Sequence, residues 1–271
     1  MQTEVLNEIK LDPKTREFYC QTLKTLNASG IPYLVGGAFA FERFTGIKRQ
    51  TKDIDIFVLP EDCDRILSLF ASKGYETYIH SPHWLAKACY GDDFVDIIFN
   101  SANGVDTVDD EWFKYAVDAK VLGIPVKICP AEEMICSKAF VMARDRFDGA
   151  DIAHMILKCN EILNWERLLK RFDKNWRILF SHLILFGFIY PGERSRIPNW
   201  VMQELLQRVQ TEINTPPPQD KICQGTLLAP LQYFIDLEHW GYKDARLHPQ
   251  GNLTSEQISQ WTEALKEEKQ R

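Results

Sequence analysis

The residues of this sequence that most clearly suggest chemistry are two aspartates one position apart in an apolar segment. Asp53 and Asp55 lie in the run Lys-Asp-Ile-Asp-Ile-Phe-Val at positions 52–58. In a β-strand the side chains of residues i and i+2 point to the same face, so the two carboxylates are expected side by side. Two like charges at that distance repel each other unless a cation lies between them. Because carboxylate oxygens suit Mg²⁺ or Mn²⁺, the pair predicts a divalent-metal site.

Two further features accompany this pair along the chain. A third acid, Asp96, lies in the apolar run 94–99, and the glycine pair Gly36-Gly37 follows an apolar run upstream. Each feature alone has a simpler explanation: Asp53 could cap a turn, Asp55 could be a solvated strand residue, and two glycines could make a tight strand-to-helix turn. Those explanations do not account for three acids together in otherwise apolar strands.

The first part of the chain alternates between helix and strand signals around these residues. The expected helices are 13–27, which Gly30 closes, a helix from Gly37 to Gly46, and 61–72, which Gly74 ends. The expected strands are 31–35, the Asp53–Asp55 run, 75–79, 84–90 and 94–100, with a hairpin or paired strand over 121–129 around Leu122-Gly123. The glycine pair is thus expected at the start of a helix, and all three acids are expected on strands.

After Pro130 the pattern becomes helical. The expected helices are 131–144, 151–163, 165–185, 198–212, 227–239 and 254–268, and the proline-rich segment 215–219 is expected to be a rigid loop. The sequence therefore predicts an α/β domain over residues 1–130 followed by a helical domain over residues 131–271.

Composition limits the classes of protein that this chain can form. Its 271 residues, 45% hydrophobic and 26% charged, are typical of a globular protein that can bury a core. The net charge of −6 argues against a broad phosphate-neutralising surface, so nucleic acid is a possible but not a favoured partner. We expect no membrane partner, because the longest strongly apolar run (183–190) is too short to span a bilayer. We also expect a cytoplasmic protein, because no secretory signal is evident and the seven scattered cysteines fit reduced thiols.

The order of these features resembles that of the nucleotidyltransferase superfamily that includes polymerase beta. The resemblance covers roughly residues 13–130 and depends on the segment Tyr-Leu-Val-Gly-Gly ending at Gly37, then Asp53-Ile-Asp55, then Asp96 on a later strand. It implies the α/β (α+β) fold of that superfamily, with a mixed sheet. It also implies transfer of a nucleoside monophosphate from a nucleoside triphosphate to a hydroxyl, with release of pyrophosphate.

The resemblance also implies roles for individual residues. Asp53 and Asp55 would bind two Mg²⁺ or Mn²⁺ ions, and Asp96 would complete the site of the catalytic ion and help to remove the proton of the acceptor hydroxyl. The backbone N–H groups of Gly36 and Gly37 would approach the triphosphate at a helix N-terminus that favours negative charge.

Basic residues are candidates for further contacts with the phosphates. Arg49 and Lys52 lie in the loop that should border the triphosphate, although a solvated loop explains them as well. Lys138, followed by the Arg144–Asp148 stretch and Asp151, resembles a segment of abortive-infection-type nucleotidyltransferases, in which the lysine would contact the phosphates of the nucleotide. An internal ion-pair network involving Lys138, Arg144, Arg146, Asp148 and Asp151 is the alternative.

Departures from relatives leave the acceptor undetermined. CCA-adding enzymes and poly(A) polymerases follow their glycines with an Arg-Asp pair, which is absent after Gly37, and small antibiotic-modifying relatives usually have Gly-Ser. A protein, an RNA or a small molecule remains possible as the hydroxyl acceptor. Two other functions stay open: a catalytically silent, antitoxin-like binding module, and a metal-dependent phosphohydrolase.

Overall fold

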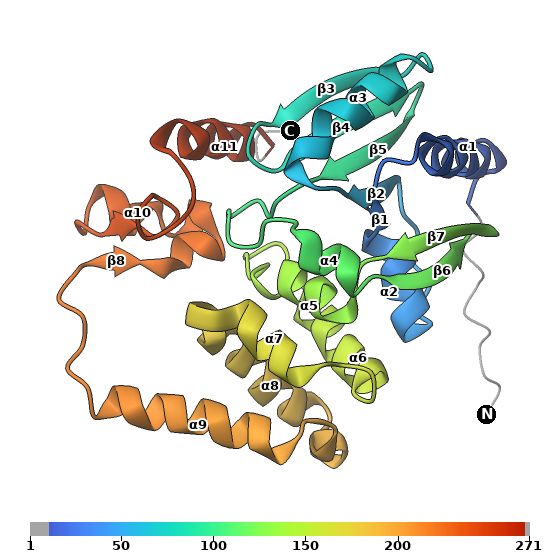
Figure 1. The fold of residues 1–271 in the computed structure, drawn as a ribbon. Helices are drawn as coiled ribbons and strands as arrows, with labels where there is room; N and C mark the ends of the chain where they lie inside the picture. The colour runs from blue at the N-terminus through green and yellow to red at the C-terminus, as the bar shows by residue number, and fades with distance from the viewer. Residues whose placement is uncertain (1–10, 269–271) are drawn as a thin grey trace. The chain divides into compact units, whose positions relative to one another are not determined.

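The structure is a computed structural model that describes residues 11–268 (Figure 1). The chain divides into two compact units. The first comprises the chain up to residue 99 together with residues 108–130, and the second comprises residues 100–107 together with the chain from residue 131 onward. The loop 100–107 therefore belongs to the second unit, although it lies inside the first domain expected from the sequence.

The first unit is built on a seven-stranded sheet with the strand order β3-β4-β5-β2-β1-β7-β6. The strands are β1 (Leu34–Val35), β2 (Asp53–Phe57), β3 (Glu76–Ser81), β4 (Leu85–Tyr90), β5 (Asp93–Ile98), β6 (Val117–Val121) and β7 (Ile124–Ile128). The sheet is mixed, because β2 with β5 and β1 with β7 pair in parallel and the other neighbours pair antiparallel. This architecture confirms the predicted α/β fold class.

Alternation of side chains explains how the central strands place the acids. Ile54 and Ile56 of β2 and Val95 and Ile97 of β5 are fully buried, whereas the acids between them are only half-buried. Burial of each such side chain contributes about 1.5–3 kcal/mol relative to exposure. A shift of either strand by one residue would reverse its faces, so this apolar burial fixes the register that directs the carboxylates away from the core.

Among its described residues the first unit also has four helices: α1 (Pro13–Ser29), α2 (Gly37–Thr45), α3 (Cys63–Ala71) and the short α4 (Asp110–Lys114). Helix α1 begins where the Asp12 carboxylate accepts a hydrogen bond from the N–H of Lys14 (2.9 Å), and it ends at Gly30, whose φ is 69°. Helix α3 follows a 3₁₀ turn over Pro60–Asp62 and packs against β3 and β4 (Figure 1).

The second unit is mainly helical within the described residues. Its helices are α5 (Ala131–Ala139), α6 (Gly149–Cys159), α7 (Trp165–Phe172), α8 (Trp176–Ile189), α9 (Asn199–Ile213), α10 (Phe234–Glu238) and α11 (Ser255–Glu268). Short 3₁₀ segments lie at Asp173–Asn175, Pro191–Arg196, Gln224–Leu227 and Pro230–Gln232. The two-residue strands β8 (Ile222–Cys223) and β9 (Lys243–Asp244) pair in parallel.

Several predicted element limits were wrong, each for a local reason. The strand expected over 31–35 contains only Leu34 and Val35, because Pro32 cannot donate a backbone hydrogen bond. The helix expected over 165–185 is interrupted at Asp173, whose φ is +36°. The helix expected over 227–239 is replaced by 3₁₀ turns and the short α10.

The hairpin around Leu122-Gly123 is present, and it contains the whole of β6, most of which the sequence did not indicate. Leu122 and Gly123 have φ values of 52° and 86°, as a two-residue hairpin turn of this kind requires. None of the seven cysteines, which all lie within residues 11–268, forms a disulfide. Among the helices of residues 11–268, none combines the length and the apolar character needed to cross a bilayer.

Candidate active site

Three carboxylates converge on one face of the central strands. Asp55 of β2 lies directly opposite Asp96 of β5 in the parallel register, and Asp53 is two residues from Asp55 on the same face. One oxygen from each of the three carboxylates lies within 4.8 Å of the other two. The structure therefore brings together the three acids that the sequence analysis selected, in a set of oxygen donors that fits a hard divalent cation.

The glycine pair lies directly against this carboxylate cluster. The backbone N–H of Gly36 donates a hydrogen bond to the carbonyl oxygen of Asp55 (3.0 Å), and α2 begins at the next residue. Gly37 has a φ of +52°, and a Cβ on it would lie 1.7 Å from Oδ2 of Asp55. The Gly36 N–H is already engaged in this bond. The backbone N–H groups that could bind a phosphate here are therefore those of the first turn of α2.

Thr51 orients one of the acids, a contact that the sequence analysis missed. Its hydroxyl donates a hydrogen bond to Oδ1 of Asp53 (2.7 Å). The signal in the sequence was only a hydroxyl residue two positions before an acid, which is too common to stand out.

Lys87 is the second residue of the site that the sequence analysis missed. In the antiparallel register of β4 and β5 it lies opposite Asp96, and its Nζ is 2.6 Å from Oδ1 of that residue. The ammonium also lies 4.3 Å from the centre of the Phe94 ring. The available signal was a single lysine between Ala86 and Ala88, both fully buried, because a charge in such a strand needs a partner.

Burial and charge perturb two ionisable groups near the cluster. Burial raises the pKa of Asp96, and the hydrogen bond and charge of Lys87 oppose that rise. Burial also raises the pKa of Tyr19 on α1, and the nearby carboxylates, Asp53 first among them, raise it further. The Tyr19 hydroxyl is buried and has no hydrogen-bond partner among residues 11–268.

The predicted phosphate-contacting residues of the 46–52 loop are exposed. The guanidinium of Arg49 lies over the ring of Phe41 at 4.4 Å from its centre, and Lys52 directly precedes β2. Their contacts with a nucleotide stay predictions.

Lys138 lies in an ion-pair cluster of the second unit. Its Nζ is 2.8 Å from an oxygen of Asp151 and 3.4 Å from an oxygen of Asp148, which Arg146 also contacts at 3.0 Å. Helix α5 ends at Ala139 rather than at residue 144, because the chain turns back to form a bridge between residues 142 and 147. Arg144 is therefore an exposed loop residue, not part of a helical face.

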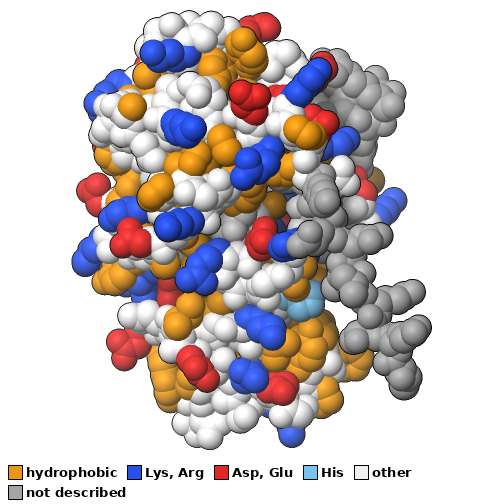
Figure 2. Space-filling view, turned by 90° about the vertical axis from the view of Figure 1, so that its right-hand side faces the viewer, with side chains coloured by type: hydrophobic (Ala, Val, Ile, Leu, Met, Phe, Trp, Pro, Cys, Tyr) orange, Lys and Arg blue, Asp and Glu red, His pale blue; other side chains and the backbone are white. Residues whose placement is uncertain are grey.

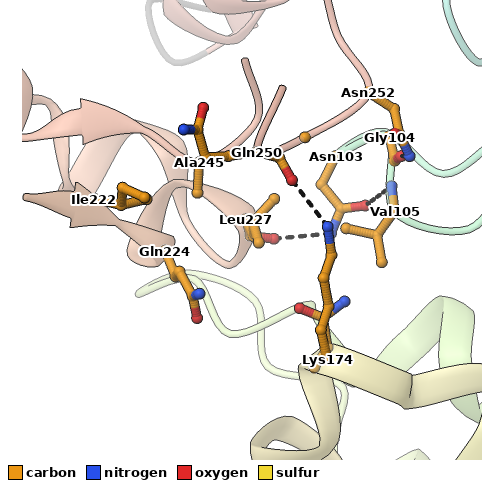
Figure 3. Close-up of a pocket in the computed structure, with 12 residues that line it drawn as sticks. Asn103, Gly104, Val105, Lys174, Ile222, Gln224, Leu227, Ala245, Gln250 and Asn252 are labelled. Carbon is orange, nitrogen blue, oxygen red and sulfur yellow. Dashed lines mark hydrogen bonds between the residues drawn. The ribbon is translucent and has the colours of Figure 1, made fainter. Parts of the chain in front are cut away.

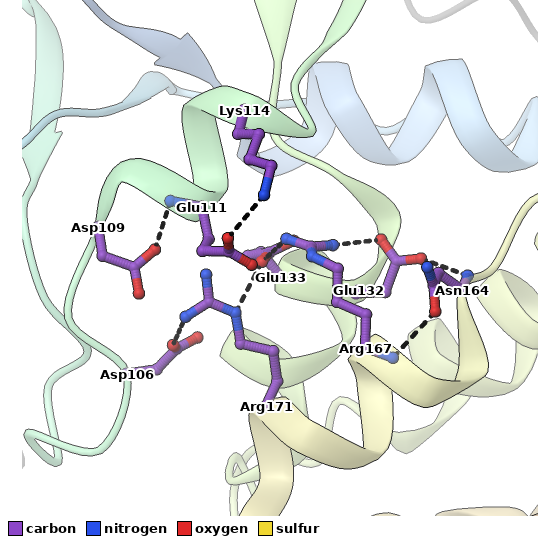
Figure 4. Close-up of polar contacts among 9 residues, drawn as sticks. All are labelled: Asp106, Asp109, Glu111, Lys114, Glu132, Glu133, Asn164, Arg167 and Arg171. Atoms are coloured by element: carbon purple, nitrogen blue, oxygen red, sulfur yellow. Dashed lines mark hydrogen bonds and ion pairs between the residues drawn. The ribbon is translucent and has the colours of Figure 1, made fainter.

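A separate network of buried charges joins α5 and α7 within the second unit (Figure 4). Arg167 pairs with Glu132 (2.8 Å) and with Glu133, and Glu133 also accepts from Nε of Arg171 (2.9 Å). Burial raises the pKa of Glu133, and the two arginines oppose that rise. Elsewhere in Figure 4, Asp109 caps α4 by accepting from the N–H of Glu111 (2.9 Å). These contacts use their charges internally, so we assign them to stability.

The second unit also contains a cavity of about 250 Å³ (Figure 3). Polar groups around it already bond to neighbouring residues of that unit: Lys174 Nζ donates to the carbonyl of Gln250 (2.9 Å) and the Asn103 amide donates to the carbonyl of Leu227 (2.9 Å). Because these polar groups already have hydrogen-bond partners, we assign no chemistry to this cavity.

On the face drawn in Figure 2, Lys and Arg side chains are interspersed with Asp and Glu rather than merged into one basic surface. The expectation that nucleic acid is not a favoured partner, drawn from the net charge of −6, stays a prediction.

A mixed sheet that gathers three carboxylates beside a helix begun by glycine is the arrangement expected of a nucleotidyltransferase. The chain belongs to the family described as "Nucleotidyl transferase of unknown function (DUF2204)", whose profile matches residues 15–173. The predicted resemblance is confirmed, and the protein is a nucleotidyltransferase. The matched segment ends just after α7, so α8 to α11 lie beyond it. No curated protein matches the sequence.

Solved structures with a similar fold include several nucleotidyltransferases. The antibiotic-resistance factor ANT(2'')-Ia is 18% identical with a TM-score of 0.47, over 64% of this chain and 98% of its own. The lincosamide antibiotic adenylyltransferase LnuA, bound to lincomycin, is 16% identical with a TM-score of 0.38, over 54% and 96%. A putative nucleotidyltransferase from Thermotoga maritima is 18% identical with a TM-score of 0.37, over 47% and 84%. Similarities this low say nothing about the acceptor of this protein.

Proposed function

We propose that this protein transfers a nucleoside monophosphate from a nucleoside triphosphate to a hydroxyl of a protein, an RNA or a small molecule, in a reaction that requires Mg²⁺ or Mn²⁺ and releases pyrophosphate. The observation that carries the proposal is the convergence of Asp53, Asp55 and Asp96, whose oxygens lie within 4.8 Å, beside the glycine that begins α2. Three carboxylates at such a distance repel one another even with the single ammonium of Lys87 beside Asp96, so their arrangement supports metal binding.

The donor set fits two divalent ions of the hard type. Asp53 and Asp55 would hold both ions, and Asp96 would help to hold the catalytic one. When bound, the ions supply positive charge to the attacking and leaving oxygens of an in-line displacement at the α-phosphorus.

The chain's own residues would do the remaining work. Asp96 would accept the proton of the acceptor hydroxyl as that oxygen attacks the α-phosphorus. The first-turn N–H groups of α2 would hold the phosphates that leave as pyrophosphate. Arg49, Lys52 and Lys138 are proposed to add positive charge to the same phosphates, where charge develops in the transition state.

The direct test is incubation of the protein with each α-labelled nucleoside triphosphate, Mg²⁺ or Mn²⁺ and a cell extract. We expect the label to move to an acceptor and pyrophosphate to be released. The variant Asp55→Asn should abolish the transfer, whereas Asp118→Asn, at an exposed acid of β6 in the same sheet, should not. Release of inorganic phosphate instead would indicate a phosphohydrolase, and nucleotide binding without turnover would indicate a silent binding module.

Ligand-dependent stability provides a second test that needs no acceptor. Mg²⁺ and a triphosphate together should stabilise the fold more than either alone, by about 2.7 kcal/mol at a hundredfold excess over Kd. Asp55→Asn should preserve or raise the stability of the ligand-free protein, because it removes a repelling charge, but should lose the gain from metal and nucleotide. A wild-type melting temperature that no metal–nucleotide pair changes would count against the proposed function.

A further inference from the structure

One row of side chains runs across the sheet from the acids to its edge. In the observed registers Asp55 of β2 lies opposite Asp96 of β5, Asp96 lies opposite Lys87 of β4, and Lys87 lies opposite Tyr78 of β3. Residues directly opposite on neighbouring strands share a face, so these four side chains form one continuous row, which we call the carboxylate row.

Lys87 is held in this row by the carboxylate of Asp96. Its side chain is 17% exposed, its Nζ is 2.6 Å from Oδ1 of Asp96, and the ring of Phe94 lies beneath the ammonium at 4.3 Å. A lysine charge with so little access to water requires an anion beside it. The anion beside it in the structure is the same carboxylate that the proposed function assigns to the catalytic ion.

The geometry of an in-line displacement indicates which substrate lies beside Lys87 and Tyr78. In an in-line displacement the attacking and leaving oxygens lie on opposite sides of the phosphorus. The proposed phosphate-binding site, the first turn of α2 from Gly37, follows β1, which borders β2 on the side away from β5. The attacking hydroxyl therefore approaches from the side of β5 and β4, where Lys87 and Tyr78 follow Asp96.

We propose, on the basis of the proposed function, that Lys87 forms an oxyanion subsite for the acceptor, and that this subsite becomes available when a divalent cation binds Asp96. With a cation bound, the Asp96 carboxylate no longer neutralises Lys87 fully, and the two positive charges repel. The ammonium then requires another anion, and the acceptor is the molecule that occupies that side.

The acceptor is therefore a hydroxyl compound that carries a phosphate or carboxylate close to its reacting oxygen. The edge strand beyond Lys87 offers flat contact surfaces to the rest of such a molecule. Tyr78 is 42% exposed, and the exposed ring of His80 lies 6.3 Å from it, centre to centre. Aromatic side chains at that position suit the apolar face of a ring in the acceptor.

The test measures binding of two small oxyanions, inorganic phosphate and acetate, by calorimetry. The protein is first saturated with α,β-methylene-ATP, which blocks transfer, and each anion is then added with and without Mn²⁺. We expect binding of at least one anion only when Mn²⁺ is present, and the anion that binds identifies the acceptor group. Lys87→Gln should weaken that binding by about tenfold or more, the effect of losing one charged hydrogen bond, and Lys87→Arg should retain most of it.

A matched control is Lys114→Gln, which removes an exposed lysine of the same unit and should change nothing. Equal anion binding by wild type and Lys87→Gln in Mn²⁺, or equal binding by wild type with and without Mn²⁺, would overturn the inference. The second comparison uses wild type alone, so it holds even if the substitution impairs folding. Failure of the wild type to bind Mn²⁺ at all would overturn the proposed function as well, which separates the two outcomes.

Discussion

The contact between Gly37 and Asp55 yields the sharpest prediction, for the variant Gly37→Ala. The backbone of Gly37 has a φ of +52°, and an added Cβ would lie 1.7 Å from Oδ2 and 2.7 Å from Cγ of Asp55. The carboxylate would have to rotate away from the alanine and therefore away from its place in the cluster. Gly46, at the other end of α2, is a matched control, because its φ is +76° and a Cβ there would meet nothing within 4 Å.

The expected magnitudes follow from these two environments. Alanine in the left-handed region destabilises the folded state by about 1–2 kcal/mol. The lower entropy of the unfolded chain offsets about 0.4–1 kcal/mol of this, so Gly46→Ala should lower the free energy of unfolding by about 1 kcal/mol. Gly37→Ala carries the same cost plus about 0.5–1.5 kcal/mol for forcing Asp55 from its rotamer, which gives about 2 kcal/mol in total.

Urea unfolding and Mn²⁺ binding together test this reasoning. Gly37→Ala should weaken Mn²⁺ binding about tenfold or more because a ligand is displaced, whereas Gly46→Ala should leave it unchanged. In an Asp55→Ala background, Gly37→Ala should cost no more than Gly46→Ala, because the colliding oxygen is gone. Additive effects of the Gly37 and Asp55 substitutions, or unchanged Mn²⁺ binding by Gly37→Ala, would refute the claim that this glycine is required by the carboxylate.

Three further predictions concern the second unit. Burial lowers the pKa of His182, although its hydrogen bond to the carbonyl of Ala139 opposes that shift, so the neutral ring stabilises the fold above the unfolded pKa of about 6.5. Stability in urea should accordingly fall as the pH drops below about 6.5 toward the folded pKa, and His182→Gln should reduce that dependence. Arg167→Met should lower the free energy of unfolding by about 3–5 kcal/mol, because it breaks a buried ion pair. Arg208→Met, at a more exposed pair, should lower it by under about 1 kcal/mol. Equal losses of stability in urea would contradict the argument from burial. Lys138→Ala should lower kcat/KM about 10²-fold, with partial recovery in Lys138→Arg; full activity of the alanine variant would exclude the proposed phosphate contact.

The local patterns around the acids were predictable because they depend on the chain's own geometry. Helix α2 begins at Gly37 and ends before Gly46 as expected, and β2 places both its aspartates on one face. Alternation between buried isoleucines and half-buried acids leaves one register for β2, and turn glycines mark the ends of helices regardless of tertiary context.

Features that depend on distant partners were not predictable from one sequence. Lys87 pairs with Asp96 only because β4 and β5 adopt one particular antiparallel register, and several registers are compatible with such short strands. Helix α5 ends at Ala139 because residues 142 and 147 form a bridge, although the intervening residues carry no strong helix-breaking signal before Gly149. Both the Lys87–Asp96 contact and the end of α5 therefore depend on pairing with residues elsewhere in the chain and not on local propensity.

The contacts of Asp55 explain why the glycine pair and the acids belong to one structural feature. Its carbonyl oxygen accepts the N–H of Gly36, its side chain occupies the volume that a Cβ on Gly37 would need, and its register partner is Asp96. A side chain at Gly37 would therefore disturb the proposed metal-binding carboxylates as well as the proposed phosphate-binding turn. The reverse also holds: a longer side chain at position 55 would push against the start of α2. The glycine pair, the paired acids and the third acid therefore form one packed feature of the site and not three separate ones.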